Sequence, residues 1–114
     1  MRVWAASCDE ATRRLLEVAC RETGHTLVLL ASLSALPPEA PSILFTDTVA
    51  LGSDPATALG PLRAKHPGVF VALVTGDTLD SARIRTLEAL GIGAYVSKPP
   101  TLSDLMGILG KIQG

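Results

Sequence analysis

The chain has 114 residues, of which 47% are hydrophobic and 18% charged, and its formal net charge is -1. This length and composition predict a single globular domain over residues 1–114 that can bury its own core. The near-zero charge gives no electrostatic basis for binding nucleic acid or an anionic membrane. No apolar stretch reaches the roughly 18 to 20 residues of a membrane span. Two cysteines do not form a disulfide framework, so we expect a cytoplasmic protein.

Five short apolar runs alternate with helix-like stretches along the chain. The runs predict strands at residues 3–6, 26–31, 43–47, 69–75 and 94–97. The first helix is expected to start at Asp9-Glu10 and to end at Gly24, and the fourth to cover residues 79–90. The last should begin at the capping box of residues 101–104. Such a (βα)5 pattern with short apolar strands predicts an α/β domain, a doubly wound parallel sheet with helices on both faces.

Prolines are expected to shorten the second and third helices. Residues 32–41 hold three prolines and support little more than one helical turn. The third helix should start with Asp54 as its N-cap and Pro55 in the first helical position. Gly60-Pro61 is expected to interrupt it, because an interior proline costs about 3 kcal/mol. His66, just after this helix, is expected on the surface.

Polar residues stand at the ends of three predicted strands. Asp47 ends the third strand, Thr75 ends the fourth, and Lys98 follows the fifth. Because the carboxyl ends of parallel strands meet at one edge of a sheet, these side chains are expected to share a site. The first strand, in contrast, ends in Ser7-Cys8 and carries no acidic pair there.

In this order and on these strand ends, the residues resemble the receiver domain of bacterial two-component response regulators over essentially the whole chain. The resemblance implies a flavodoxin-like fold with strand order 2-1-3-4-5, and a signalling domain, not an enzyme. It implies that Asp47 is the candidate phospho-acceptor and that Thr75 carries the hydroxyl that follows the phosphoryl group. Tyr95 matches the aromatic residue that changes rotamer on activation, and Lys98-Pro99 matches a lysine–proline pair that is usually cis.

The chain departs from the family on the metal side of the site. Counted back from Gly24, the two acidic residues with which the family holds Mg²⁺ fall on Ser7 and Cys8. A one-residue bulge could bring Asp9 into the metal position, but the spacing from Cys8 to Gly24 argues against it. Asp47 then remains as the sole carboxylate ligand beside a backbone carbonyl, and a thiol suits this hard cation poorly.

We therefore predict that Mg²⁺ binding is doubtful and that phosphorylation of Asp47 is slow or absent, because phosphoryl transfer needs cations to neutralise the developing charge. Lys98 is expected to pair directly with Asp47, an attraction of about 4 kcal/mol at 4 Å and an effective dielectric near 20, before desolvation. Ordinary roles are the alternative: a turn cap for Asp47, a strand-end hydroxyl for Thr75, a solvated Lys98 and a half-buried strand aromatic for Tyr95.

The sequence leaves three functions open. The first is an atypical receiver in a phosphorelay, whose partner is a histidine kinase, a phosphotransfer protein or a downstream effector. Its contacts would use the face of the fourth helix, fifth strand and fifth helix, where Arg83 and Arg85 lie. Nucleic acid and membrane partners are not expected, and the oligomeric state is not predicted.

The second function is a phosphorylation-independent pseudo-receiver that binds a small ligand such as a nucleotide. The third is an aspartate-nucleophile phosphohydrolase, which is disfavoured because Val49 stands where such enzymes generally carry a second acid. A dinucleotide-binding enzyme is disfavoured as well, because Gly91-Ile92-Gly93 precedes a strand and not a helix.

Overall fold

Five strands form one all-parallel sheet in the order β2-β1-β3-β4-β5. The computed structural model describes all residues except Ser7, Asp77 and Gly114, and it leaves out the side chain of Gln113. The strands are β1 (Arg2–Ala6), β2 (Thr26–Leu30), β3 (Ile43–Thr46), β4 (Phe70–Thr75) and β5 (Ile92–Ser97). The predicted sheet and strand order are confirmed.

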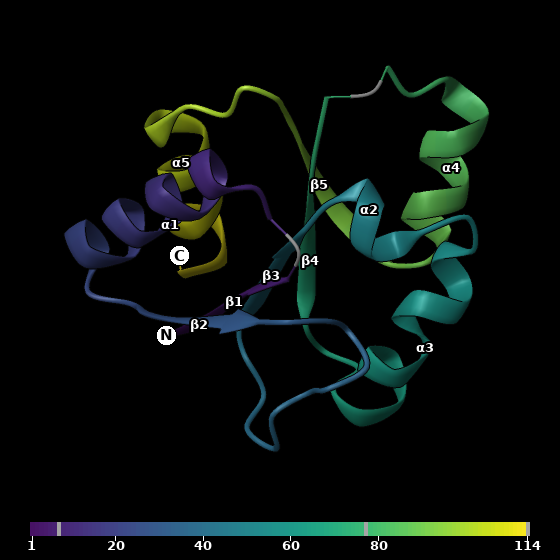
Figure 1. Ribbon diagram of the computed structural model, residues 1–114, viewed down its shortest axis with the longest axis horizontal. Coiled ribbons are helices and arrows are strands. Elements are labelled where there is room, and N and C mark those ends of the chain that lie inside the picture. Colours follow the sequence, from purple (N-terminus) through teal and green to yellow (C-terminus); the bar gives the residue numbers. More distant parts are fainter. Residues whose placement is uncertain (7, 77, 114) are drawn as a thin grey trace.

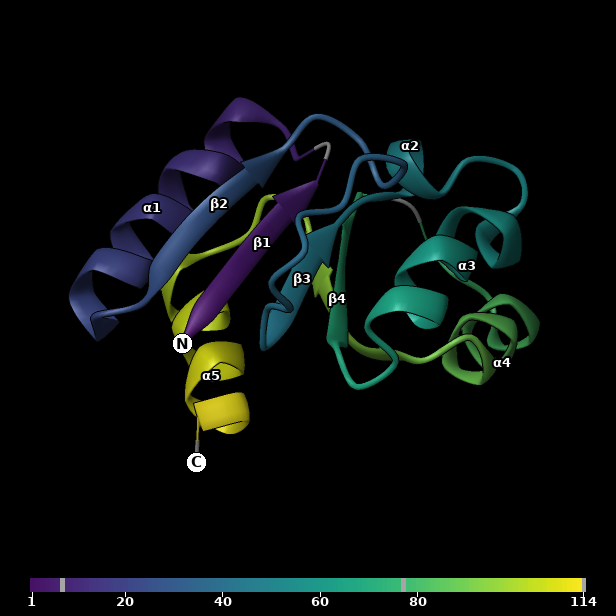
Figure 2. The same ribbon diagram turned by 90° about the horizontal axis from the view of Figure 1, so that it is seen from below.

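Helices cover both faces of this sheet. They are α1 (Glu10–Thr23), α2 (Thr48–Leu51), α3 (Pro55–Lys65), α4 (Ser81–Ala89) and α5 (Leu102–Gln113). Helices α1 and α5 lie on one face, and α2, α3 and α4 lie on the other (Figures 1 and 2). In the described part of the chain, no helix has both the length and the apolarity that crossing a membrane requires.

Each face of the sheet has its own hydrophobic core, because side chains alternate along a strand. In β1, Val3 and Ala5 belong to the core beneath α1 and α5, whereas Trp4 belongs to the core beneath α3 and α4. In β3, Phe45 and Leu44 divide between the two cores in the same way. Burial on both faces explains why these strands read as continuous apolar runs and not as an alternating pattern.

The helix ends follow the capping signals in the sequence. The Asp9 carboxylate accepts the N–H of Thr12 at 2.8 Å and starts α1. Gly24 ends this helix with φ of 76°, a left-handed conformation that favours glycine. At α5, the Thr101 N–H donates to Asp104 Oδ2 at 3.3 Å, and the Asp104 N–H donates to Thr101 Oγ1 at 3.1 Å. The predicted capping box is therefore confirmed.

The proline-rich segments differ from the prediction in two ways. Residues 31–42 contain no helix, only turns and bends that connect β2 to β3. Helix α3, in contrast, continues through Pro61, so the predicted interruption at Gly60-Pro61 is wrong. Leu59 and Leu62 of α3 are 1% and 0% exposed, and burial of such side chains contributes about 1.5–3 kcal/mol each, enough to offset the proline.

His66, expected on the surface, is in fact buried. Its ring packs edge-on against Trp4 with 5.6 Å between the ring centroids. Its Nε2 donates to the carbonyl oxygen of Pro37 at 3.2 Å, since a carbonyl can only accept. The neighbouring Lys65 Nζ donates to the carbonyl oxygen of Leu36 at 3.2 Å. Side chains at the end of α3 thus hold the irregular segment 31–42 against the domain by hydrogen bonds.

Arg63 connects α3 to the residue before β4 and to the turn before β5. Its guanidinium donates to the carbonyl oxygens of Val69 at 2.7 Å and Gly91 at 2.8 Å. Gly91 has φ of 94°, and a Cβ there would collide with this guanidinium. At Gly93 a Cβ would collide with the ring of Phe70. Close packing therefore explains both glycines of Gly91-Ile92-Gly93.

Candidate functional site

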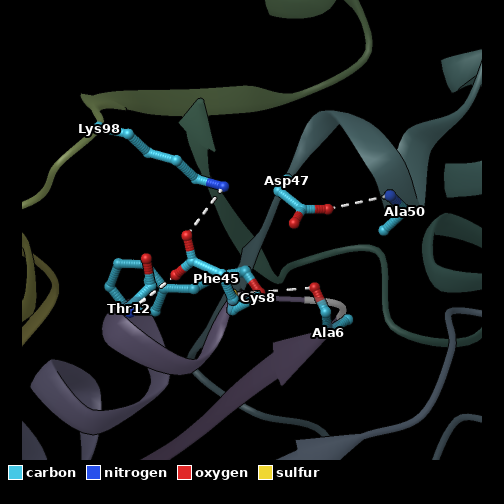
Figure 3. Close-up of polar contacts among 8 residues, drawn as sticks. Ala6, Cys8, Thr12, Phe45, Asp47, Ala50 and Lys98 are labelled. Carbon is cyan, nitrogen blue, oxygen red and sulfur yellow. Dashed lines mark hydrogen bonds and ion pairs between the residues drawn. The ribbon is translucent and has the colours of Figure 1, made fainter. Parts of the chain in front are cut away.

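The structure brings Asp47, Thr75 and Lys98 to the same edge of the sheet. Strand β3 pairs with β4, and β4 pairs with β5 so that Thr75 lies opposite Ser97. The Lys98 N–H donates to the carbonyl oxygen of Thr75 at 3.0 Å. Figure 3 shows the side chain of Lys98 extending toward the region in which Asp47 and Cys8 lie. The grouping expected from the strand ends is thus present.

Asp47 is nearly enclosed, with 4% of its surface exposed. Its Oδ1 accepts the N–H of Ala50 at 3.0 Å, which makes Asp47 the N-cap of the short helix α2. Among the described residues, no cationic group lies within ion-pair distance of this carboxylate. The capping role considered from the sequence is therefore real, and it satisfies one carboxylate oxygen without a metal or a lysine.

Lys98 pairs with Asp9, not with Asp47 as expected. The Nζ atom lies 3.4 Å from Asp9 Oδ2, and the two side chains are 28% and 49% exposed. Pairing with the more exposed carboxylate costs less desolvation than moving the ammonium against buried Asp47. Hydrogen bonds from Thr12, aided by the Lys98 charge, hold the pKa of Asp9 below its usual value. The positive charge thus lies on the α1 side of the site.

Cys8 fills the end of β1 with a neutral group. Its Sγ lies 3.8 Å from the carbonyl oxygen of Phe45 and 3.9 Å from that of Ala6 (Figure 3). Burial, and then the negative charge of Asp47, raise the pKa of this thiol to about 12. At neutral pH the thiol therefore stays protonated, and it is neither a nucleophile nor a ligand for a hard cation.

These residues do not fit a Mg²⁺ site, which needs oxygen ligands in near-octahedral geometry, usually with one or two carboxylates. Asp47 offers one carboxylate, whereas the two oxygens of the Asp9 carboxylate are engaged by Thr12 and Lys98. No group of three or more His, Cys, Asp or Glu side chains in the described ranges could hold a metal ion. Ser7, to which the resemblance assigns a metal position, lies outside the described residues.

Tyr95 packs against α4. Its hydroxyl donates to the carbonyl oxygen of Ile84 at 3.3 Å. Burial, with a contribution from Glu88, raises its pKa, so the phenol remains a donor well above neutral pH. The change of rotamer expected for Tyr95 stays a prediction, whereas the Lys98-Pro99 peptide bond is cis as expected.

No protein-family model matches the sequence, and no curated protein matches it. Solved structures match the fold. A response regulator from Thermotoga maritima is 20% identical with a TM-score of 0.81, over 97% of this chain and 95% of that chain. The receiver domain of a sensor histidine kinase from Pseudomonas aeruginosa, solved with magnesium in its active-site cleft, is 21% identical with a TM-score of 0.75, over 99% and 98% of the two chains.

A putative pilus assembly protein from Burkholderia thailandensis also matches, with 23% identity and a TM-score of 0.73, over 99% of this chain and 98% of that chain. All three likenesses extend over nearly the whole length of both chains. The chain therefore has the fold of response regulator receiver domains, with the strand order and the helix placement that this fold requires.

Proposed function

We propose that this chain is an atypical receiver domain that binds Mg²⁺ weakly and is phosphorylated slowly or not at all on Asp47. It signals through contacts with other proteins and is not an enzyme. The observation that carries this proposal is the ion pair between Asp9 and Lys98 beside a neutral Cys8. Asp47 lies beside Thr75 and Lys98 on the β4 and β5 side, whereas on the β1 side the described residue Cys8 offers no ligand for a hard cation.

The electrostatics of phosphoryl transfer support slow chemistry. The attacking carboxylate and the transferred group are both anionic, so the transition state depends on nearby positive charge. Here Asp9 already neutralises part of the Lys98 charge, and the neutral Cys8 adds no anionic ligand for a cation. Each 1.36 kcal/mol of lost stabilisation lowers a rate about tenfold, so losing a few kcal/mol slows phosphorylation by about two to three orders of magnitude.

The partner surface that we propose is the face made by α4, β5 and α5. Arg83 and Arg85 are exposed on α4, and their guanidinium groups can pair with acidic side chains of a partner. A histidine kinase, a phosphotransfer protein or a downstream effector would be the partner, and the domain would act in the cytoplasm. Arg83→Glu with Arg85→Glu would weaken such contacts, since like charges oppose association.

Acetyl phosphate with Mg²⁺, followed by intact-mass spectrometry, tests the proposal. We expect the native chain to keep its mass, as the Asp47→Asn control does. Ser7→Asp combined with Cys8→Asp should gain one phosphoryl group, because it supplies two carboxylates where the family binds its metal. Cys8→Asp alone serves if the double variant does not fold. Rapid stoichiometric phosphorylation of the native chain would contradict the proposal.

The likeness to the pilus assembly protein supports a second candidate, a docking domain of an assembly machine. In this role the receiver fold supplies a protein-binding surface, and phosphorylation of Asp47 is dispensable. An in-frame deletion of residues 1–114 distinguishes the two candidates. Loss of surface pili in electron micrographs favours assembly, whereas intact pili with an altered kinase-dependent output favour signalling.

A further inference from the structure

A cavity of about 400 Å³ lies next to the Asp47 site, between α4, β5 and the connection from β4 to α4. This volume falls in the range of about 300–1,000 Å³ that is common for small-molecule pockets. Its apolar lining includes the side chains of Leu79 and Ile84, whereas the side chain of Val96 belongs to the core under α1 and α5. The Tyr95 ring completes this lining, held in place by the hydrogen bond from its hydroxyl to the Ile84 carbonyl at 3.3 Å.

The described residues at the rim of the cavity are polar, and one of them is a lysine. Thr78 and Ser97 present exposed hydroxyl-bearing side chains there, beside the backbone of Gly76. Lys98 supplies the one formal charge among the described residues that line the cavity. An apolar wall with hydroxyl groups and an ammonium at its mouth is complementary to a ligand with an apolar body and an acidic group.

The ammonium group is available to such a ligand at small cost. The ion pair between Lys98 and Asp9 is partly exposed, with side chains 28% and 49% accessible, and pairs of this kind contribute little to stability. Asp9 also keeps its hydrogen bond from the Thr12 N–H when the lysine leaves. An anion in the cavity can therefore take the lysine from Asp9 without leaving a buried charge unpaired.

We propose that this cavity binds a small organic anion, a compact apolar ring or chain that carries one phosphate or carboxylate group. The acidic group contacts Lys98 with the hydroxyl groups of Thr78 and Ser97, and the apolar body lies on Leu79, Ile84 and the Tyr95 ring. This site goes beyond the proposed receiver function, because binding needs neither Mg²⁺ nor phosphorylation. The ligand alters the domain by loosening the link between the end of β5 and α1.

Titration of the ¹⁵N-labelled full chain with phenyl phosphate, read by amide NMR shifts, tests this site. We expect saturable shifts at Gly76, Thr78 and Ser97. Inorganic phosphate has only the acidic group of this probe and phenol only its ring. Each should bind at least roughly tenfold more weakly than phenyl phosphate. Benzoate in place of phenyl phosphate shows which acidic group is preferred. No saturable shift with either anion, or shifts spread over the whole surface, would overturn the proposal.

Two variants with a matched control test the roles of charge and shape. Lys98→Gln should weaken phenyl phosphate binding roughly tenfold and leave phenol binding unchanged, whereas Lys111→Gln on exposed α5 surface should change neither. Thr78→Trp at the exposed rim should block both ligands and keep the native amide spectrum elsewhere. Equal affinities for Lys98→Gln and Lys111→Gln, or full binding by Thr78→Trp, would contradict the site.

Discussion

Two carboxylates that both act on Cys8, those of Asp47 and Asp9, are stabilised in different ways. Asp47 is buried and is satisfied by a backbone N–H, whereas Asp9 is half exposed and takes both a backbone N–H and the lysine. Among the described residues Asp47 has no counter-ion, and burial of an unpaired charge costs more than its exposure. This difference underlies the first prediction.

We predict that Asp47→Asn raises the free energy of unfolding by about 1 kcal/mol, because asparagine keeps the cap to Ala50 and removes the buried charge. Asp47→Ala should show no such gain, since it also removes the cap. Urea denaturation of the three proteins checks this. Asp54→Asn is the matched control at an exposed N-cap, and it should bring no gain in stability, because hydrogen bonds from Thr57 favour the charged form of Asp54. A destabilised Asp47→Asn protein would contradict the prediction.

Because of Cys8, the free energy of unfolding should fall as the pH rises above about 9. Its pKa rises from 9.0 in the unfolded chain to about 12 in the folded domain. The stabilisation from the protonated thiol is full below pH 9 and is lost as the pH rises toward 12, because the unfolded chain then releases a proton that the folded chain holds. Cys8→Ser should therefore lose less stability than the native chain over this pH range.

Chemical denaturation at several pH values between 8 and 11 measures this slope. Cys20→Ser provides the comparison, since burial also raises the pKa of Cys20 but no neighbouring carboxylate contributes to that shift. The slope should flatten most in Cys8→Ser. An unchanged slope in that variant would show that the thiol of Cys8 ionises normally in the folded chain.

At the scale of elements, sequence patterns predicted correctly those helix ends and strands that depend on residues close together in the chain. The strands, the caps of α1 and the capping box of α5 follow from periodicity and from residues close in sequence. Helix α3 was not predicted correctly, because burial of Leu59 and Leu62 against the sheet outweighs the local cost of Pro61. Helix α2 was missed because four residues carry too little periodicity to be recognised.

For the candidate site, too, some features could be predicted from the sequence and others could not. Strand ends predicted that Asp47, Thr75 and Lys98 share one edge, because parallel pairing alone brings them there. The partner of Lys98 could not be predicted, since the choice between Asp9 and Asp47 depends on burial of each carboxylate. Asp9 did carry a signal, its position as a helix N-cap. The cavity beside Tyr95 has no sequence signal, because it depends on how α4 packs on β5.

Replacement of Pro61 tests whether packing holds α3 together. Pro61→Ala should raise the free energy of unfolding by about 1–3 kcal/mol, because alanine restores a backbone donor inside the helix and removes the ring clash. Pro55→Ala is the matched control, since proline fits the first helical position and its loss should bring no gain. Thermal and urea unfolding measure both. Equal effects of the two substitutions would contradict the interpretation.

At the scale of the whole molecule, Arg63 connects parts that are distant in sequence. Its guanidinium reaches carbonyl oxygens before β4 and in the turn from α4 to β5. Arg63→Lys should lower the free energy of unfolding by about 2 kcal/mol, because an ammonium cannot reproduce the planar fork. Arg14→Lys, on an exposed α1 pair with Glu10, should cost under about 0.5 kcal/mol. Equal stabilities of the two variants would exclude this role.

The whole domain combines an intact receiver fold with a metal side that is built from a thiol and an ion pair. The fold depends on two cores and on distributed contacts, to which the metal side contributes only the packing of Cys8 and the cap of α1 by Asp9. Weak cation binding, as we propose it, would therefore leave the architecture and the α4–β5–α5 face unaffected. In the function that we propose, the domain acts as a protein-binding module although its phosphoryl chemistry is weak.

An NMR titration of the native chain with Mg²⁺ and beryllofluoride tests this central claim most directly. If the site binds Mg²⁺ weakly, the amide signals of Thr75 and Tyr95 will show no strong saturable shift. The variant with Ser7→Asp and Cys8→Asp should respond at both residues, which confirms that the experiment can detect binding. Strong saturable shifts at Thr75 and Tyr95 in the native chain would contradict the claim.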